Sequence, residues 1–338
     1  MRHSLVARFG KNFIITISAP ILVYLFFYTL CHTTGHTGFG VGSDFRTILL
    51  NMVYSGLISL AVSYNLTSGR FDFSVGSVLI LSVIAGGTLA KTWNGGAFEM
   101  LLLILAFGLI CGLISGLVYI ALRLPPMVTS LGMAMIYEAI AFKLNDSNGI
   151  RLTSKFNMLI WAQPPYHLLL LAGVLLILIY LLNFTVFGYN CRSLQRGQKN
   201  AVDVGINEKR NAVICYIIAG GLMGCAGAVY ISQYGYIAPQ TGLNSVSFIM
   251  SAFLPMFIGG ALAKFSDRNI GVIMGAFVQA CISSGLVNMG VSSSLKAVID
   301  GMVVLVFLVY VSNSYKLTLK KLFSQKKARA LAEQSSGF

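Results

Sequence analysis

Long apolar runs alternate with short polar connections along most of the chain. The runs lie at about 12–31, 47–66, 73–92, 98–122, 125–144, 166–187, 212–233, 246–263, 269–289 and 295–313. A helix that crosses a bilayer needs roughly 20 mostly apolar residues, and its backbone must form hydrogen bonds within the segment. The runs are continuous, whereas the strands of a membrane barrel alternate. The pattern therefore predicts an all-α polytopic membrane protein with about ten transmembrane helices.

The composition supports the same class of protein. Of the 338 residues, 56% are hydrophobic and only 10% are charged, whereas soluble domains carry roughly 25% charged residues. So few charges cannot cover a water-soluble core of this size. The apolar runs leave room only for loops and short ends, so we expect residues 1–338 to form a single transmembrane domain.

The distribution of basic residues predicts how the chain is oriented. The net charge is +14, but basic residues collect at the cytoplasmic ends of membrane spans, so this charge does not indicate a nucleic-acid partner. With a cytoplasmic N-terminus and alternating spans, the outer side holds only six of the 24 Lys and Arg residues. These six are Arg46, Lys91, Lys143, Arg151, Lys155 and Lys296. We therefore expect both termini, the polar loop at about 188–211 and the basic tail 314–338 to be cytoplasmic.

The first break in the apolar pattern is SGRFDFSVGS at 68–77, between the second and third runs. Asp72 and Ser74 can cap the third helix, because side-chain oxygens accept hydrogen bonds from the free N–H groups at a helix start. One interpretation is a helix cap at an interfacial turn. The other is a cap that also holds a broken helix, with Gly76 in its first turn, near a transport path.

The second break is PPMVTSLG at 125–132, directly after the fourth run. Proline is tolerated in the first turn of a helix, where its missing N–H is not needed, so Pro125 and Pro126 predict a helix start and a tight hairpin. Glu138 lies within this fifth run. An ionisable residue there is a functional candidate if it faces a cavity, and otherwise an interfacial carboxylate.

The third break is the polar stretch 188–211, the longest charged connection between runs. Residues 200–204 read as a short helix, and Gly205 suits the left-handed turn that ends one. A short amphipathic helix that projects from a membrane protein is a natural docking element for a cytoplasmic partner. A solvated loop without a partner is the alternative.

Several chemical signatures are absent from the sequence. It contains no GxxxxGK[ST] phosphate loop, HExxH zinc motif, GxSxG elbow or paired Cys and His spacing. The six cysteines form no CxxC pair and read as small buried hydrophobic residues. We therefore expect no catalytic residues, no metal site and no cofactor in this chain.

At the three breaks the chain resembles the permease subunits of bacterial ATP-binding-cassette importers for simple sugars, the ribose, xylose, galactose and autoinducer-2 group, over roughly 45–313. The family's Gly-Gly-Ile-Asp-Leu-Ser-Val-Gly-Ser appears as SGRFDFSVGS, and its Pro-Pro-Phe-Ile-Val-Thr-Leu-Gly as PPMVTSLG. Its Leu-Asn-x-Thr-x-Phe-Gly lies at 182–188. Its Gly-x-Asn-x-x-Ala-Ala-x-x-Ser-Gly-Ile loop corresponds to 197–206, with a shift of a residue or two at the front.

The resemblance implies a type II importer permease in the bacterial plasma membrane. Two permease subunits, the same or related chains, would pair around a path, and an extracellular binding protein would deliver the solute. A separate cytoplasmic ATPase would bind ATP and Mg²⁺ and would dock on the coupling residues Gly197, Asn200, Ala201, Asp203, Gly205 and Ile206. The residues of the path or its broken helices would be Asp72, Ser74, Gly76, Pro125, Pro126 and Gly132.

The chain also departs from this family. Gly-Arg-Phe replaces Gly-Gly-Ile before Asp72, no acid occurs in 244–260, and Glu138 stands where many relatives have arginine. After Gly260 the usual glycine-rich turn is replaced by ALAKFSDRNIG. These differences leave the identity of the solute open.

A neutral sugar needs hydrogen-bonding side chains and aromatic faces along its path. Candidate solute contacts in or near the spans are Asn51, Tyr54, Asn65, Gln279 and Asn288. Each of them could equally bond a neighbouring helix.

Two other functions are compatible with a polytopic chain. A secondary transporter driven by an ion gradient often contains broken helices, but a proton relay needs more acids than Glu138 and Asp300 within the spans. A membrane enzyme or scaffold is the third possibility, and no convergent acid, base and nucleophile supports an enzyme.

Overall fold

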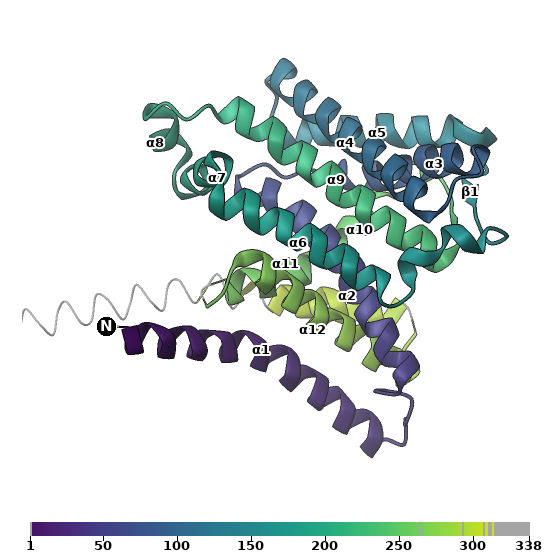
Figure 1. The fold of residues 1–338 in the computed structure, drawn as a ribbon, viewed down its shortest axis with the longest axis vertical. Helices are drawn as coiled ribbons and strands as arrows, with labels where there is room; N and C mark the ends of the chain where they lie inside the picture. Colours follow the sequence, from purple (N-terminus) through teal and green to yellow (C-terminus); the bar gives the residue numbers. More distant parts are fainter. Residues whose placement is uncertain (1, 264, 293, 307, 310–312, 314–338) are drawn as a thin grey trace, which may run out of the picture. The chain divides into compact units, whose positions relative to one another are not determined.

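The computed structural model describes residues 2–263, 265–292, 294–306, 308–309 and 313 (Figure 1). The chain forms two compact units, Met1–Met289 and Gly290–Phe338. In the second unit, residues 294–306 are helical. The predicted tail 314–338 and part of the tenth predicted span lie outside the described residues. The prediction of one domain over the whole chain stays a prediction.

The first unit is built almost entirely from helices (Figure 1). Its long helices are α1 (Arg2–Thr33), α2 (Gly42–Thr67), α3 (Val75–Thr92), α4 (Ala97–Leu122), α5 (Pro126–Lys143), α6 (Tyr166–Phe184), α9 (Glu208–Tyr234) and α12 (Arg268–Asn288). Its shorter helices are α7 (Val186–Arg196), α8 (Gln198–Asp203), α10 (Val246–Met250) and α11 (Phe253–Leu262). Single turns η1 (Leu144–Ser147), η2 (Phe156–Met158) and η3 (Ile160–Ala162), and strands β1 (Ile150–Arg151) and β2 (Tyr236–Ile237), complete it.

Among the described residues, eight helices are long and apolar enough to cross a membrane. They correspond to the first seven predicted runs and the ninth, which confirms the prediction of an all-α polytopic membrane protein. The tenth run, 295–313, is only partly described.

The eighth run, 246–263, was expected as one continuous span, and this expectation is wrong. It forms two short helices, α10 and α11, separated by Ser251 and Ala252. Pro255 lies in the first turn of α11. A proline ring clashes with the carbonyl four residues earlier and offers no N–H to it, so the helical hydrogen bonds are interrupted between Ser251 and Pro255. Hydropathy alone does not register this break.

Glycines allow α4 and α9 to pack closely against each other over an extensive contact. A Cβ atom on Gly220 would lie 2.2 Å from the Gly108 carbonyl oxygen, and one on Gly112 would lie 2.3 Å from the Tyr216 carbonyl oxygen. Small residues let helix backbones approach closely in lipid, where apolar burial does not drive helices together. These glycines therefore serve packing, whereas a Cβ atom on Gly260 would meet nothing within 4 Å.

A short ladder closes one end of the bundle. The antiparallel strands β1 and β2 pair Ile150 with Ile237 and Arg151 with Tyr236. Sequence patterning did not predict these strands, because two residues are too few to show an alternation. The ladder joins the loop after α5 to the segment that follows α9, from which the chain turns back toward the bundle.

Candidate translocation and coupling site

Two helices begin next to each other inside the bundle. A Cβ atom on Gly76, the second residue of α3, would lie 2.0 Å from the carbonyl oxygen of Ser245, the residue before α10. No side chain fits in that space, so glycine is required at position 76. The starts of α3 and α10 therefore touch, although they are far apart in the sequence.

The start of α3 lies at the level of the middle of its neighbours. Asp72 and Ser74 line one small cavity together with Gly112 and Gly220. Gly112 is near the middle of α4 and Gly220 is near the middle of α9. The connection between α2 and α3, residues 68–74, thus lies within the bundle. We call this segment the helix break.

Asp72 organises the helix break. Its Oδ1 accepts hydrogen bonds from the Ser74 backbone N–H at 2.9 Å and the Ser74 hydroxyl at 2.6 Å, and its Oδ2 accepts one from Asn65 Nδ2 at 3.4 Å. We expected both Asp72 and Ser74 to cap α3, but no side chain caps this helix. Ser74 already has helical dihedral angles, and its hydroxyl donates to Asp72, so Asp72 closes the turn that precedes the helix.

Glu138 on α5 holds the start of α10. Its two carboxylate oxygens accept hydrogen bonds from the backbone N–H groups of Leu243 and Ser245, each at 2.9 Å. The side chain is buried, so Glu138 does not extend into solvent. Because N–H groups at a helix start lack intrahelical partners, a carboxylate there is favourable. The sequence singled out Glu138, but nothing local linked it to residues more than 100 positions away.

The two prolines begin α5 as expected. Pro125 precedes the helix, Pro126 is its first residue, and Arg123 takes a left-handed conformation at the end of α4. One turn further on, the Ser130 hydroxyl lies 3.4 Å from the Phe71 carbonyl oxygen, which attaches α5 to the helix break. A Cβ atom on Gly132 would meet nothing within 4 Å, and the structure gives no reason for glycine there.

The five candidate solute contacts lie in different surroundings. Asn65 bonds Asp72 in the helix break. Tyr54 packs against Tyr230, with ring centroids 5.6 Å apart, next to α10. Asn288 donates to Asp44 and joins α12 to α2.

The remaining two candidates form fewer contacts. Gln279 is buried, and its Oε1 has no hydrogen-bond partner among the described residues. Asn51 is half-buried. The five residues therefore do not form one site, and only Asn65 has a hydrogen bond to the helix break in the described part of the chain.

The predicted cytoplasmic helix is present as α8, and it begins two residues earlier than expected. It ends in a left-handed turn at Gly205 (φ +92°), where the Ile206 N–H donates to the Ala201 carbonyl at 3.1 Å. Ala201 is buried against the bundle, whereas Val202 and Val204 are 44% and 78% exposed. Two exposed valines, Val202 on α8 and Val204 directly after it, form an apolar surface suited to a protein partner.

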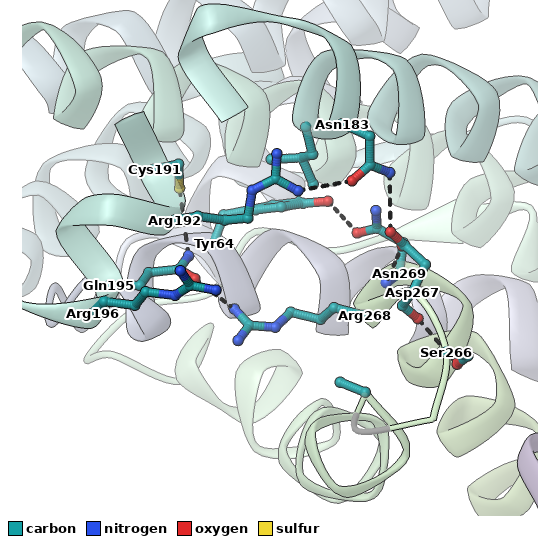
Figure 2. A pocket seen from close by; sticks show the side chains of 12 residues that line it. Tyr64, Asn183, Cys191, Arg192, Gln195, Arg196, Ser266, Asp267, Arg268 and Asn269 are labelled. Atoms are coloured by element: carbon teal, nitrogen blue, oxygen red, sulfur yellow. Dashed lines mark hydrogen bonds between the residues drawn. The ribbon is translucent and has the colours of Figure 1, made fainter. Parts of the chain in front are cut away.

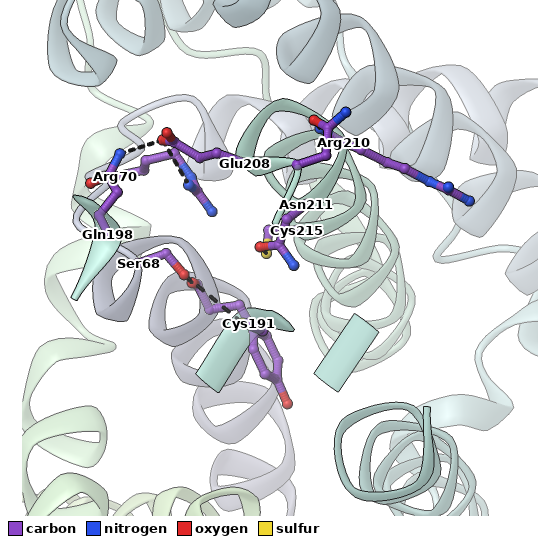
Figure 3. Close-up of polar contacts among 10 residues, drawn as sticks. Ser68, Arg70, Cys191, Gln198, Glu208, Arg210, Asn211 and Cys215 are labelled. Atoms are coloured by element: carbon purple, nitrogen blue, oxygen red, sulfur yellow. Dashed lines mark hydrogen bonds and ion pairs between the residues drawn. The ribbon is translucent and has the colours of Figure 1, made fainter. Parts of the chain in front are cut away.

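A chain of polar contacts joins α8 to the helix break (Figure 3). Gln198 at the start of α8 donates a hydrogen bond to Glu208 Oε1, and Arg70 Nη1 lies 3.8 Å from the same oxygen. The Arg70 backbone N–H donates to the Asn65 carbonyl at 2.9 Å. Sequence reasoning noted Arg70 as a cytoplasmic basic residue and as a departure from a family pattern, but it did not find the partner Glu208, which is distant in the sequence.

A cavity of about 450 Å³ lies beside α7 (Figure 2). It is lined by side chains from the last turns of α2 and α6, from α7, and from the start of α12. Arg192 donates to Asn183 Oδ1 at 3.0 Å, and Arg268 donates to Gln195 Oε1 at 3.1 Å. We call it the arginine cavity.

Comparison with known proteins shows a family and individual relatives to which the chain is similar. Residues 45–308 match the model of a family described as branched-chain amino acid transport system / permease component. The chain is 28% identical over 260 residues to the autoinducer 2 import system permease protein LsrC of Photorhabdus luminescens, which covers 75% of this chain and 77% of that protein.

Two further relatives have similar sequence identity and coverage. The ribose import permease protein RbsC of Bacillus subtilis (strain 168) is 26% identical over 269 residues, covering 77% of this chain and 81% of that protein. An LsrC protein of Yersinia pestis (strain Pestoides F) is 27% identical over 293 residues, covering 83% and 82%.

Proposed function

The chain belongs to this family of transport-system permease components, and we propose that it forms the translocation path for a simple sugar or a related small polar solute in an ATP-binding-cassette importer. The observation that carries the proposal is the exposed helix α8, which is connected through Glu208 and Arg70 to the helix break. A projecting docking helix that is joined to a break inside the bundle can convert an external motion into a change of the path.

The energy would come from a partner. The sequence contains no phosphate loop, so a separate cytoplasmic ATPase would bind ATP and Mg²⁺ and hydrolyse the nucleotide. The other partners would be a second permease subunit and an extracellular solute-binding protein, in a bacterial plasma membrane with both termini cytoplasmic. The import functions for which the relatives are named and the asymmetry of basic residues support this arrangement.

The relatives favour a sugar-like solute. Two are named for the import of autoinducer 2 and one for ribose, whereas the family description names branched-chain amino acids. Tyr54 and Asn65 offer an aromatic face and amide groups, the chemistry that binds neutral polar solutes. Because these groups are few and scattered, we infer that the permease binds its solute weakly and that the delivering protein provides the affinity.

The contacts suggest how a movement of α8 would reach the path. A displacement of Gln198 acts on Glu208 and then on Arg70, which is part of the helix break. The helix break leads directly into α3, and Gly76 of α3 touches the start of α10. Glu138 holds the start of α10 on α5, so the two helix starts would move relative to a common support.

The test replaces residues 200–205 by a Gly/Ser stretch of equal length. We expect the ATPase no longer to co-purify with the chain, and uptake to be lost, while the protein still inserts into the membrane. The control replaces residues 34–37, which are exposed in the loop before α2, by a shorter Gly/Ser stretch of their own length.

Unchanged co-purification and uptake would contradict the coupling role of α8. Uptake that persists after ATP depletion, with an ion gradient intact, would instead support a gradient-driven transporter.

A further inference from the structure

The arginine cavity has a strongly basic wall. Three guanidinium groups line it, those of Arg192, Arg196 and Arg268, against the single carboxylate of Asp267. Both oxygens of this carboxylate already accept hydrogen bonds, Oδ1 from the Asn269 N–H at 2.9 Å and Oδ2 from Asn183 Nδ2 at 3.1 Å. The acid is therefore used to hold the turn before α12, and it does not pair with the arginines.

The arginines keep many donors free. A guanidinium group has five N–H donors. Arg192 and Arg268 each use one nitrogen, Nη1, on a neutral side-chain oxygen. Arg196 forms no polar contact within the described part of the chain, and Figure 2 shows it beside Gln195 at the wall of the cavity. No hydrogen bond or ion pair joins the remaining donors to Asp267, the carboxylate among the cavity residues.

Asn269 gives a second, independent indication of a missing acceptor. Its side chain is 1% exposed and lines the cavity. Its Oδ1 accepts from the Tyr64 hydroxyl, but its Nδ2 has no partner among the described residues. A buried donor without a partner costs about 1–3 kcal/mol, so the site is incomplete without an acceptor that enters the cavity.

The surroundings also favour negative charge on Cys191, which lines the same wall. A hydrogen bond from Cys215, the Ser68 hydroxyl and the guanidinium groups of Arg70 and Arg268 together lower the pKa of the Cys191 thiol. Even with Cys191 ionised, the three arginines outnumber the negative groups in the wall.

We propose that the arginine cavity is a binding site for a phosphate group, carried either by an anionic lipid of the adjacent leaflet or by a free anion in solution. Guanidinium forks match phosphate oxygens in geometry as well as in charge. The volume of about 450 Å³ leaves room for a phosphate and the group attached to it. Basic residues at span ends are common, but a general excess of charge requires neither a cavity lined by three arginines nor an unpaired buried amide donor beside them.

The test uses the full chain in nanodiscs of neutral phosphatidylcholine. Its thermal unfolding is followed as inorganic phosphate replaces chloride at constant ionic strength, and a parallel sample contains phosphatidylglycerol. We expect saturable stabilisation by one or both probes. Arg268→Gln should raise the half-saturating concentration of each stabilising probe about tenfold, because the variant loses one charge-assisted hydrogen bond to the phosphate.

Two further variants make the result specific. Asn269→Asp places a carboxylate among the arginines and should abolish the response without removing a guanidinium. Arg210→Gln removes an exposed arginine near α8, outside the cavity, and should respond like the wild type. Stabilisation by phosphate but not by phosphatidylglycerol would identify a free anion as the ligand. Stabilisation by phosphatidylglycerol but not by phosphate would identify a lipid headgroup.

The proposal is overturned if neither probe stabilises the wild type. It is also overturned if Arg268→Gln and Arg210→Gln respond equally. Because the measurement needs no ATPase and no transport, its outcome is independent of the proposed function.

Discussion

At the residue scale, the contact between α4 and α9 depends on individual glycines, which carry no Cβ atom. Gly220→Ala would place a Cβ atom 2.2 Å from the Gly108 carbonyl oxygen, so the helices must separate, and we expect a loss of about 1–3 kcal/mol, as for other overpacked cores. Gly173→Ala on α6 is the control, because a Cβ atom there meets nothing within 4 Å. The measurement is thermal unfolding of both variants, and equal melting temperatures would contradict the packing role of Gly220.

Glu138 offers a second test at this scale. Glu138→Gln replaces one acceptor oxygen with an NH₂ group that faces a backbone N–H, and hydrogen bonds to charged groups contribute about 1.5–3 kcal/mol. We expect the amides of Leu243 and Ser245 to exchange hydrogen faster, measured by mass spectrometry. Glu99→Gln, the same change at an exposed helix start, should leave that segment unchanged. Unaltered exchange in Glu138→Gln would show that the carboxylate does not hold the start of α10.

At the element scale, the connection between α8 and the helix break can be tested by a double-mutant cycle. Arg70→Met and Glu208→Gln remove the two partners of one contact, so we expect each to lower the uptake per ATP hydrolysed. The double variant should be no worse than either single one, with an interaction energy of about 0.5–3 kcal/mol. Transport and ATP hydrolysis would be measured in proteoliposomes that contain the complete importer.

The control for this cycle is Lys209→Met, which alters an exposed neighbour of Glu208. Strictly additive losses in the double variant would mean that Arg70 and Glu208 act separately. Arg70 is buried, and two of its nitrogens, Nε and Nη2, have no partner among the described residues. The contact to Glu208 is therefore the main electrostatic compensation for its charge in the described structure.

The elements also differ in how well their boundaries follow from sequence. Helices such as α4 and α9 follow from hydropathy because lipid imposes one requirement along the whole segment. The separation of α10 from α11 coincides with Pro255 in the first turn of α11. Strands β1 and β2 exist only because two distant loops meet.

At the scale of the whole molecule, the charge asymmetry predicts which loops face the cytoplasm. His36→Cys and Val204→Cys introduce thiols at exposed positions of opposite ends of the bundle, whereas all six native cysteines are buried. We expect a membrane-impermeant maleimide to label His36→Cys on intact cells and Val204→Cys only in inverted vesicles. The reverse pattern would place α8 outside the cytoplasm and contradict its docking role.

The candidate site was only partly predictable. Asp72, Ser74 and the prolines stood out because they interrupt apolar runs, and Glu138 stood out as a carboxylate within one. Their partners did not, since the contacts of Glu138 with Leu243 and of Arg70 with Glu208 join residues that no local pattern connects. Sequence reasoning counted the three arginines of the arginine cavity as cytoplasmic basic residues and did not bring them together.

By itself, the sequence determined the membrane class, the eight described long helices in their order, and the short helix α8, because burial in lipid and helix-ending turns act over neighbouring residues. Only the tertiary structure decided that α3 and α10 begin against each other and that Glu138 supports α10. It also decided that three arginines surround one cavity. Such contacts depend on how helices pack, and packing is settled by the fit of surfaces from distant parts of the chain.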